Sequence, residues 1–244
     1  MIKPNLPNKM ITKAIVSSLA SEKILYKLNE FGINTLKLFG NMKYDIPVKQ
    51  HPDMYITHCS SDELFYLANF CSIVGDVDFP FSVIEPVDNK GLIKYPHDVL
   101  LNAAVLGDKL ICCKKHVHNE IIEFALKNDI QVVNVNQGYV KCNLCIVDDN
   151  SIITEDRGIA NTLTKVGVDV LLLEKHCVNL EGYEYGFIGG ASGKISDVEL
   201  AFFGDIKKHL EYERIKIFLS KKGVRPVSLS DEPLTDLGSL IPIA

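Results

Sequence analysis

The feature that most constrains the fold of this chain is a unit that recurs four times: a helix pattern, a turn residue, and a strand rich in β-branched residues. The four turns and their strands are residues 32–36, 129–133, 167–171 and 223–227. Apolar residues precede each strand at the spacing of one helix face, as Ile24, Leu25 and Leu28 do before the first. Glycine begins three of the four segments and often ends a helix, because it adopts a left-handed backbone without strain. A helix followed by a strand is therefore the expected building unit.

Hairpins are expected between these units. Their first strands begin at residues 54, 102, 142 and 185, and a last apolar strand covers 237–243. The expected turns are Ser60-Ser61-Asp62, Gly107-Asp108, Asp148-Asp149-Asn150 and Ser192-Gly193-Lys194. The five strand starts are separated by 48, 40, 43 and 52 residues. Such a period, built from a hairpin, a helix and a strand, is typical of radial repetition, because one unit alone cannot bury its faces.

Five strand starts require five helix-strand units, and only four are clear. Over residues 68–101, Pro80, Pro86 and Pro96 leave no helix pattern. The chain begins, however, with the strand pattern Lys13–Ser17, and its last strand has no helix after it. We expect the N-terminal segment to complete the fifth unit, which would close the ring and remove exposed sheet edges. The predicted fold class is α/β, with five pseudo-symmetric units in a single domain over residues 1–244.

Composition excludes several classes of protein. The net charge of −5, from 26 basic and 31 acidic residues, disfavours a nucleic-acid-binding surface. No apolar run approaches the roughly 20 residues that span a bilayer, so no membrane association is expected. The N-terminus lacks a signal-peptide pattern, and seven cysteines are an odd count for a disulfide framework. A cytoplasmic protein with reduced thiols is expected, and its oligomeric state stays open.

Three segments carry a resemblance to a known family. They are His51–Met54, Asn136–Cys142 and Gly182–Gly193. With the five-unit pattern, they make the chain resemble the pentein superfamily, the α/β-propellers of guanidino-group-modifying enzymes. The more specific resemblance is to an uncharacterised bacterial pentein-like family, over nearly the whole chain. It implies a pentein propeller closed by the N-terminal segment, with a small-molecule ligand on its axis.

The residues depart from the pattern of the characterised pentein hydrolases. In those enzymes a cysteine in the last unit attacks the guanidinium carbon, and a histidine opening the fourth unit is the acid or base. Here the last unit reads Asp236–Pro242, and no cysteine follows Cys177. In those enzymes a leucine follows this histidine, and Asn179 and Leu180 stand at the corresponding positions here. An asparagine does not titrate, so it cannot be the acid or base. The usual nucleophile and histidine are therefore both absent from their usual positions.

The resemblance implies a ligand site at the entrances to the five inner strands. Those entrances carry His51, Asp53, Asn102, Gln137, Lys141, Cys142, Asn179, Asp236 and Ser239. This polar set suits a small guanidino, ureido or amino-acid-like molecule, bound without cofactor or metal. In a catalytic protein Cys142 would be the nucleophile and His51 the proton carrier, as in an amidinotransferase or hydrolase of guanidino compounds. The alternative is a non-catalytic pentein that acts as a binding or interaction module.

Two cysteines and a glycine-rich segment have simpler interpretations than their motifs suggest. Residues three apart on a strand over 142–147 face opposite ways, so Cys142 and Cys145 would not share a metal or a disulfide. Cys142 alone, beside Lys141, is a candidate thiolate. Gly186–Lys194 departs from the phosphate-loop pattern and indicates a hairpin whose glycines allow close backbone approach. His51-Pro52-Asp53 fits either a turn capped by the aspartate or part of a site. Glu155-Asp156-Arg157 fits the solvated start of a helix.

Overall fold

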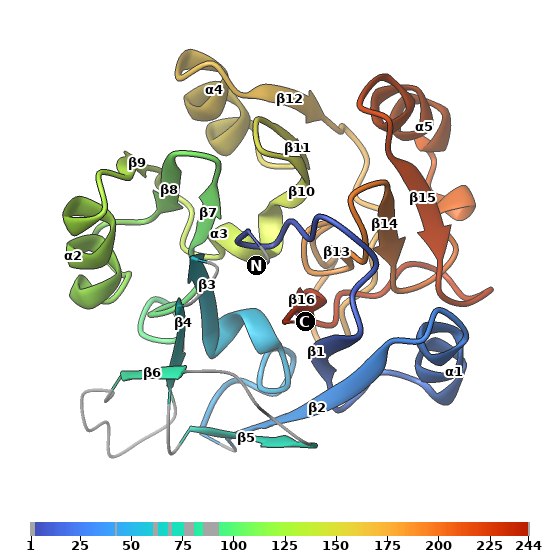
Figure 1. Ribbon diagram of the computed structural model, residues 1–244, viewed down its shortest axis with the longest axis horizontal. Coiled ribbons are helices and arrows are strands. Elements are labelled where there is room, and N and C mark those ends of the chain that lie inside the picture. Colours follow the sequence, from blue (N-terminus) through green and yellow to red (C-terminus); the bar gives the residue numbers. More distant parts are fainter. Residues whose placement is uncertain are drawn as a thin grey trace.

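The computed structural model describes residues 3–41, 43–60, 63–67, 70–75, 81–84 and 93–243. Its strands form five small sheets around the middle of the molecule, with the longer helices outside them (Figure 1). The sheets are β16-β1-β2-β5, β3-β4-β6, β7-β8-β9, β10-β11-β12 and β13-β14-β15. The strands are β1 Lys13–Ser17, β2 Asn34–Gly40, β3 Ile56–Ser60, β4 Glu63–Leu67, β5 Cys71–Val74, β6 Phe81–Ile84, β7 Ala104–Leu106, β8 Lys109–Cys112, β9 Gln131–Asn134, β10 Cys145–Asp148, β11 Ser151–Thr154, β12 Asp169–Leu172, β13 Ser192–Lys194, β14 Glu199–Phe202, β15 Arg225–Ser228 and β16 Ile241–Pro242.

All five sheets contain the same three-strand pattern. In each sheet two strands pair antiparallel, and a third strand lies parallel to one of these two. In one sheet the antiparallel pair joins the two ends of the chain, with Ile15 of β1 opposite Ile241 of β16. The predicted pairing of the last strand with the N-terminal segment is therefore confirmed.

Four helices lead into the parallel strands, as the sequence predicts. They are α1 Glu22–Glu30, α2 Asn119–Lys127, α4 Arg157–Lys165 and α5 Tyr212–Lys221, and the short helices are η1 Pro52–Met54, α3 Val140–Asn143 and η2 Ile206–Lys208. Gly32, Gly167 and Gly223 end three of the long helices with φ of +74°, +84° and +67°. At the fourth junction Asp129 takes the same left-handed conformation, with φ of +57°. The repeated unit is thus defined locally, by an amphipathic helix and its C-terminal turn.

The segment between β4 and β6 differs from the other crossovers. Its described part forms β5, which pairs antiparallel with β2 instead of covering its own sheet as a helix. Ser61 and Asp62 of the expected first turn, and Pro80 and Pro86, lie outside the described residues.

Two expected local structures are wrong, and both lie near the middle of the molecule. Cys142 belongs to the helical turn α3 and not to a strand, because the Asn102 side-chain oxygen accepts hydrogen bonds from the backbone N–H groups of Lys141 and Cys142. An acceptor at these first-turn donors stabilises a helical turn. The strand expected from residue 185 begins only at Ser192, and residues 192–194 form β13 and not a hairpin loop, since they pair with β14. The turn at Gly107-Asp108 is confirmed, with Leu106 opposite Lys109.

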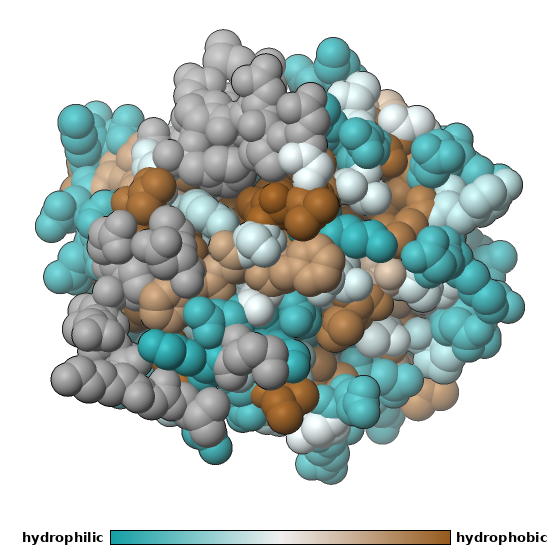
Figure 2. Space-filling model, turned by 90° about the horizontal axis from the view of Figure 1, so that it is seen from below, coloured by the Kyte–Doolittle hydropathy of each residue, from teal (hydrophilic) through white to brown (hydrophobic). Residues whose placement is uncertain are grey.

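Buried apolar side chains form four clusters between sheets. Examples from the four clusters, in order, are Leu38 with Leu110, Ile111 with Ile152, Ile153 with Phe202, and Ala14 with Phe203. Each cluster contains residues from at least two sheets, so the sheets hold one another in place. Figure 2 shows hydrophobic side chains across the middle of the face seen from below, the side on which β2 and β5 lie in Figure 1. Phe39 of β2 and Val74 of β5 are exposed. Among the described residues, no helix has both the length and the apolar composition that crossing a membrane requires.

Candidate active site

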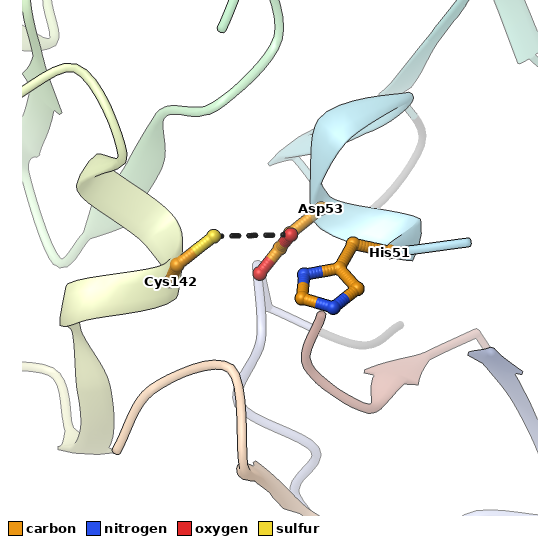
Figure 3. A group of neighbouring side chains, drawn as sticks. All are labelled: His51, Asp53 and Cys142. Atoms are coloured by element: carbon orange, nitrogen blue, oxygen red, sulfur yellow. Dashed lines mark hydrogen bonds between the residues drawn. The ribbon is translucent and has the colours of Figure 1, made fainter. Parts of the chain in front are cut away.

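Side chains that precede the inner strands of different sheets meet at the centre of the molecule. His51 and Asp53 lie at η1 before β3, Asn102 precedes β7, Lys141 and Cys142 lie on α3 before β10, and Asp236 and Ser239 precede β16. All seven side chains are buried. Figure 3 shows Asp53 between Cys142 and His51, with Cys142 approaching from α3 and the other two from η1. We call these seven residues the central cluster.

The Cys142 thiol donates a hydrogen bond to the Asp53 carboxylate within this cluster. The Cys142 sulfur lies 3.2 Å from Oδ1 of Asp53, and the Asn102 amide nitrogen donates to the same sulfur at 3.1 Å. Asn102 also donates to the backbone carbonyl of Asp53 at 3.0 Å. One asparagine therefore fixes the position of the thiol and of the segment that carries the carboxylate.

Ser239 connects the other face of Asp53 to Lys141. The Lys141 ammonium donates to Oγ of Ser239 at 2.9 Å. This hydroxyl lies 2.8 Å from Oδ2 of Asp53 and 3.0 Å from the carbonyl oxygen of Gly189, and its one proton serves one of these two acceptors. A cation, a hydroxyl and a carboxylate from three chain segments are thus held in series.

Asp236 is held in place by the backbone. Its two carboxylate oxygens accept hydrogen bonds from the N–H groups of Phe187, at 2.9 Å, and Gly238, at 3.0 Å. Each oxygen keeps a second lone pair for a ligand. His51 Nδ1 lies 3.6 Å from Oδ1 of Asp236 and has no hydrogen-bond partner although it is buried. An unpaired buried nitrogen beside a fixed carboxylate is unusual in a folded protein.

Three glycines allow this close packing. A Cβ atom on Gly190 would lie 1.9 Å from Oδ1 of Asp236, and one on Gly238 would lie 2.2 Å from Cβ of His51. At Gly189 the nearest atom would be the Cys142 carbonyl oxygen, at 2.5 Å. The Gly190 N–H also donates to that carbonyl, at 2.8 Å. The glycine-rich segment therefore brings its backbone against the site, as its composition indicates.

Burial sets the protonation of the central cluster. Burial, with the Asp53 and Asp236 carboxylates close by, raises the pKa of the Cys142 thiol well above its ordinary value. Burial likewise raises the pKa of Asp53, and it raises the pKa of Asp236 to about 6. It lowers the pKa of His51 and of Lys141. At neutral pH the site therefore contains a neutral His51 imidazole and a protonated Cys142 thiol.

A pocket of about 260 Å³ opens onto this cluster. Its buried floor is formed by His51, Cys142 and Asp236. The remaining lining residues are mostly aromatic or apolar: Val48, Tyr139, Leu180, Tyr183, Glu184, Tyr185 and Phe187. Phe187 lies between Tyr139 and Tyr185, with ring centroids 6.4 Å and 6.1 Å away. A small polar floor under an aromatic wall is the common form of a small-molecule site.

Two of the predicted site residues lie elsewhere. Asn179 is exposed, and its backbone pairs with residues 234–236. Gln137 lies in a separate hollow beside α4, where its amide nitrogen is 3.3 Å from Oδ2 of Asp156. The backbone of Gly189 and Gly190 takes the place expected for Asn179 at the fourth strand entrance.

The aromatic wall was not anticipated from the sequence. Tyr183, Tyr185 and Phe187 lie within five consecutive residues of the segment 182–193, for which the sequence indicates a family resemblance and a hairpin but no pocket wall. The clustering of aromatics beside glycines was the available signal.

Glu155 also differs from expectation: it is buried, and its Oε2 accepts a hydrogen bond from Ile188 N–H at 3.0 Å. Burial raises the pKa of Glu155 to about 8.

The same cluster offers ligands that a metal would accept. His51, Asp53 and Cys142 each place one donor atom within 4.8 Å of the others. Nitrogen, sulfur and carboxylate oxygen are the donors that zinc prefers, although a zinc site needs a fourth ligand. No disulfide joins any of the seven cysteines.

Comparison with solved structures identifies the fold. The inosamine-phosphate amidinotransferase StrB1 of Streptomyces griseus aligns over 100% of this chain and 97% of its own, at a TM-score of 0.57 and 7% identity. SxtG, an amidinotransferase of the saxitoxin biosynthetic pathway from Microseira wollei, gives 0.53 and 11% identity over 94% and 91% of the two chains. A C. jejuni agmatine deiminase variant with substrate bound gives 0.52 and 13% identity, with the same coverage. The chain therefore has the pentein fold.

Sequence comparison adds the family. No curated protein matches this chain in sequence. A family profile matches residues 15–241, which include every residue of the central cluster. The chain belongs to the family of unknown function DUF6873.

Proposed function

We propose that this protein is a five-unit pentein propeller, a single domain that binds a small guanidino compound on its axis and cleaves a C–N bond of the guanidino group. The observation that carries the proposal is the pocket floor, where a cysteine, a histidine and a carboxylate from three segments lie together beneath an aromatic wall. The amidinotransferases and the deiminase that share the fold support the substrate class.

The electrostatics of the floor favour a cation. Burial raises the pKa values of the carboxylates Asp53 and Asp236 although the charge of Lys141 opposes this rise, so a further positive charge beside them would be favourable. A guanidinium supplies that charge and presents planar N–H groups that carboxylates bind in pairs. It would also give the unpartnered Nδ1 of His51 a neighbouring donor.

The bound cation also activates the nucleophile. Burial and the neighbouring carboxylates raise the pKa of Cys142 well above its ordinary value, so the thiol is protonated at neutral pH. A guanidinium beside the sulfur would lower this pKa, because an opposite charge within about 4–6 Å favours the thiolate. The free protein would therefore keep an unreactive thiol, and the substrate would generate its own nucleophile.

Proton transfer completes the reaction. The Cys142 sulfur forms a bond to the guanidinium carbon, and the bond from that carbon to the leaving nitrogen breaks. His51, whose ring nitrogen lies within 4.8 Å of the thiol, transfers the thiol proton to the departing amine. Water, or an acceptor amine in a transferase, then attacks the carbon and gives its proton to His51. The carbon–sulfur bond breaks, and the proton returns to Cys142.

Ligand-dependent stability tests the binding step. Arginine, agmatine, citrulline and dimethylarginine are added separately, and the Tm is followed. A ligand at 100 times its Kd stabilises the fold by about 2.7 kcal/mol, which is about 5–10 °C for a chain of this size. At least one guanidino compound is expected to produce this shift. No shift with any of them contradicts the proposal.

Cysteine variants test the chemical step. Cys142→Ser should bind the same compound and release no amine or ammonia from it, whereas Cys177→Ser, at a cysteine outside the cluster, should turn over like the parent protein. Wild-type binding without turnover would instead support the interaction-module alternative. Stoichiometric zinc in the purified protein would assign His51, Asp53 and Cys142 to a metal site and overturn the nucleophile.

A further inference from the structure

We infer that the substrate is a guanidine that carries no carboxylate and has a second positive charge at the far end of its tail. The inference rests on the proposed function and specifies its substrate class. It comes from the charges along the pocket and from how exposure changes with depth.

The pocket is graded from a buried floor to an exposed rim. His51, Cys142 and Asp236 are at most 2% exposed, whereas Tyr183 and Tyr185 are 45% and 37% exposed. Glu184, between these two tyrosines, is also exposed. A guanidinium bound at the floor therefore has its tail directed past the aromatic wall toward residues 183–185.

The charges at both levels have the same sign. Asp236 is the carboxylate of the floor and Glu184 that of the rim. Among the described residues, the lining contains no lysine or arginine that could bind a carboxylate on the substrate. The buried Lys141 donates its hydrogen bond to Ser239. An α-carboxylate, as in arginine, would thus meet Glu184 with no counter-charge, whereas an ammonium would be attracted to it.

The aromatic wall fits the same tail. Faces of tyrosine and phenylalanine rings bind both alkyl chains and cations. The volume of about 260 Å³ lies just below the usual range for drug-sized ligands, so the occupant is small. A guanidinium joined by a short alkyl chain to an ammonium meets all these requirements.

Four probes of matched length test the inference by calorimetry. Agmatine has the alkyl chain and the ammonium, n-butylguanidine lacks the ammonium, arginine adds the carboxylate, and argininamide neutralises it. Cys142→Ser replaces the wild type for any probe that is turned over. Agmatine should bind at least tenfold more tightly than arginine, and argininamide should recover most of that difference. Raising the salt concentration should reduce the advantage of agmatine over n-butylguanidine, because rim charges are screened.

Two variants separate the rim charge from a general loss of charge. Glu184→Gln should weaken agmatine about five- to tenfold and leave n-butylguanidine within twofold. Glu181→Gln, an exposed glutamate three residues away that does not line the pocket, should change neither. Arginine binding as tightly as agmatine, or equal losses for agmatine and n-butylguanidine in Glu184→Gln, overturns the inference and leaves the proposed function standing. Failure of all four guanidines to bind overturns the proposed function itself.

Discussion

The outer layer of this molecule uses glycine for its backbone conformation, whereas the centre also uses glycine for space. In the outer layer, a Cβ atom on Gly32, Gly167 or Gly223 would find no other atom within 4 Å, so these glycines serve the left-handed helix ends. At the centre, a Cβ atom on Gly190 would lie 1.9 Å from a carboxylate oxygen. Gly190 is needed there because a side chain would not fit, and not because of its backbone conformation. The outer layer is therefore specified by local conformation, and the centre by contacts between segments distant in sequence.

Polar groups differ between the two regions in the same way. The outer-layer ion pair of Lys23 with Asp231 lies in solvent, where such pairs contribute little. At the centre, Asp53, Lys141 and Ser239 are buried and depend on one another for hydrogen bonds. Removing one partner there leaves the others unsatisfied, which is costly in a buried environment. Substitutions at the centre should thus have larger effects than similar substitutions outside it.

The largest effect is expected for Gly190→Ala. The new methyl group would displace Asp236, which accepts hydrogen bonds from Phe187 and Gly238. Overpacking and the lost hydrogen bonds should together lower the free energy of unfolding by about 3 kcal/mol or more. Gly167→Ala is the control and should cost only about 1 kcal/mol, from backbone strain. Urea unfolding of both variants measures the difference, and equal losses would remove the distinction between the two kinds of glycine.

A smaller loss is expected for Ser239→Ala. Without the hydroxyl, the Lys141 ammonium loses an acceptor and Asp53 Oδ2 loses a neighbour, and both groups stay buried. The cost should be about 2 kcal/mol in urea unfolding. Ser220→Ala, on the exposed side of α5, is the matched control and should change stability by no more than about 0.5 kcal/mol. A loss no larger than that of the control would mean that the hydroxyl does not support the cluster.

Glu155→Gln should stabilise the protein in a pH-dependent way. The folded-state pKa of Glu155 is raised to about 8, so the unfolded chain ionises at a lower pH than the folded protein. Stability is therefore lost as the pH rises from about 4.5 toward 8. Glutamine keeps an oxygen for the Ile188 N–H and cannot ionise, so the variant should gain about 1–2 kcal/mol at pH 8 and little at pH 4.5.

Unfolding in urea at the two pH values measures this change. Glu123→Gln, at an exposed position on α2, serves as the control and should show no gain that grows with pH. A gain of the same size at both pH values would attribute the effect to packing and not to ionisation.

The sequence predicts the outer layer well because its signals are local. The strands β2, β9, β12 and β15 follow their helices at the expected positions, since periodicity and helix-end residues lie within one segment. The same reasoning fails for α3, because the Asn102 side chain that accepts from its first-turn N–H groups is 39 residues away. Helical turns that depend on distant partners leave no periodic pattern.

The site is predictable in part for a related reason. The resemblance to penteins implies a ligand site at the strand entrances, and the polar side chains there include His51, Asp53, Asn102 and Cys142 of the central cluster. The entrance expected for Asn179 is instead formed by the backbone of Gly189 and Gly190, whose carbonyl and N–H groups have no side-chain signature. The burial of Glu155 likewise depends on Ile188, 33 residues away, which no local pattern reveals.

The smallest effect is expected for Ser21→Ala at the start of α1. The Ser21 hydroxyl accepts a long hydrogen bond of 3.4 Å from Ile24 N–H, so its loss should cost about 0.5 kcal/mol, at the lower end for an N-cap. Because α1 lies outside the sheets (Figure 1), ligand-induced shifts in Tm should keep their size in this variant. Asp156→Ala, at the N-cap of α4, has a shorter bond of 2.7 Å to Ile159 N–H and should cost more, about 1 kcal/mol. A reduced ligand response in Ser21→Ala would mean that the start of α1 is coupled to the site. The distinction between an outer layer specified locally and a centre specified by distant contacts would then fail.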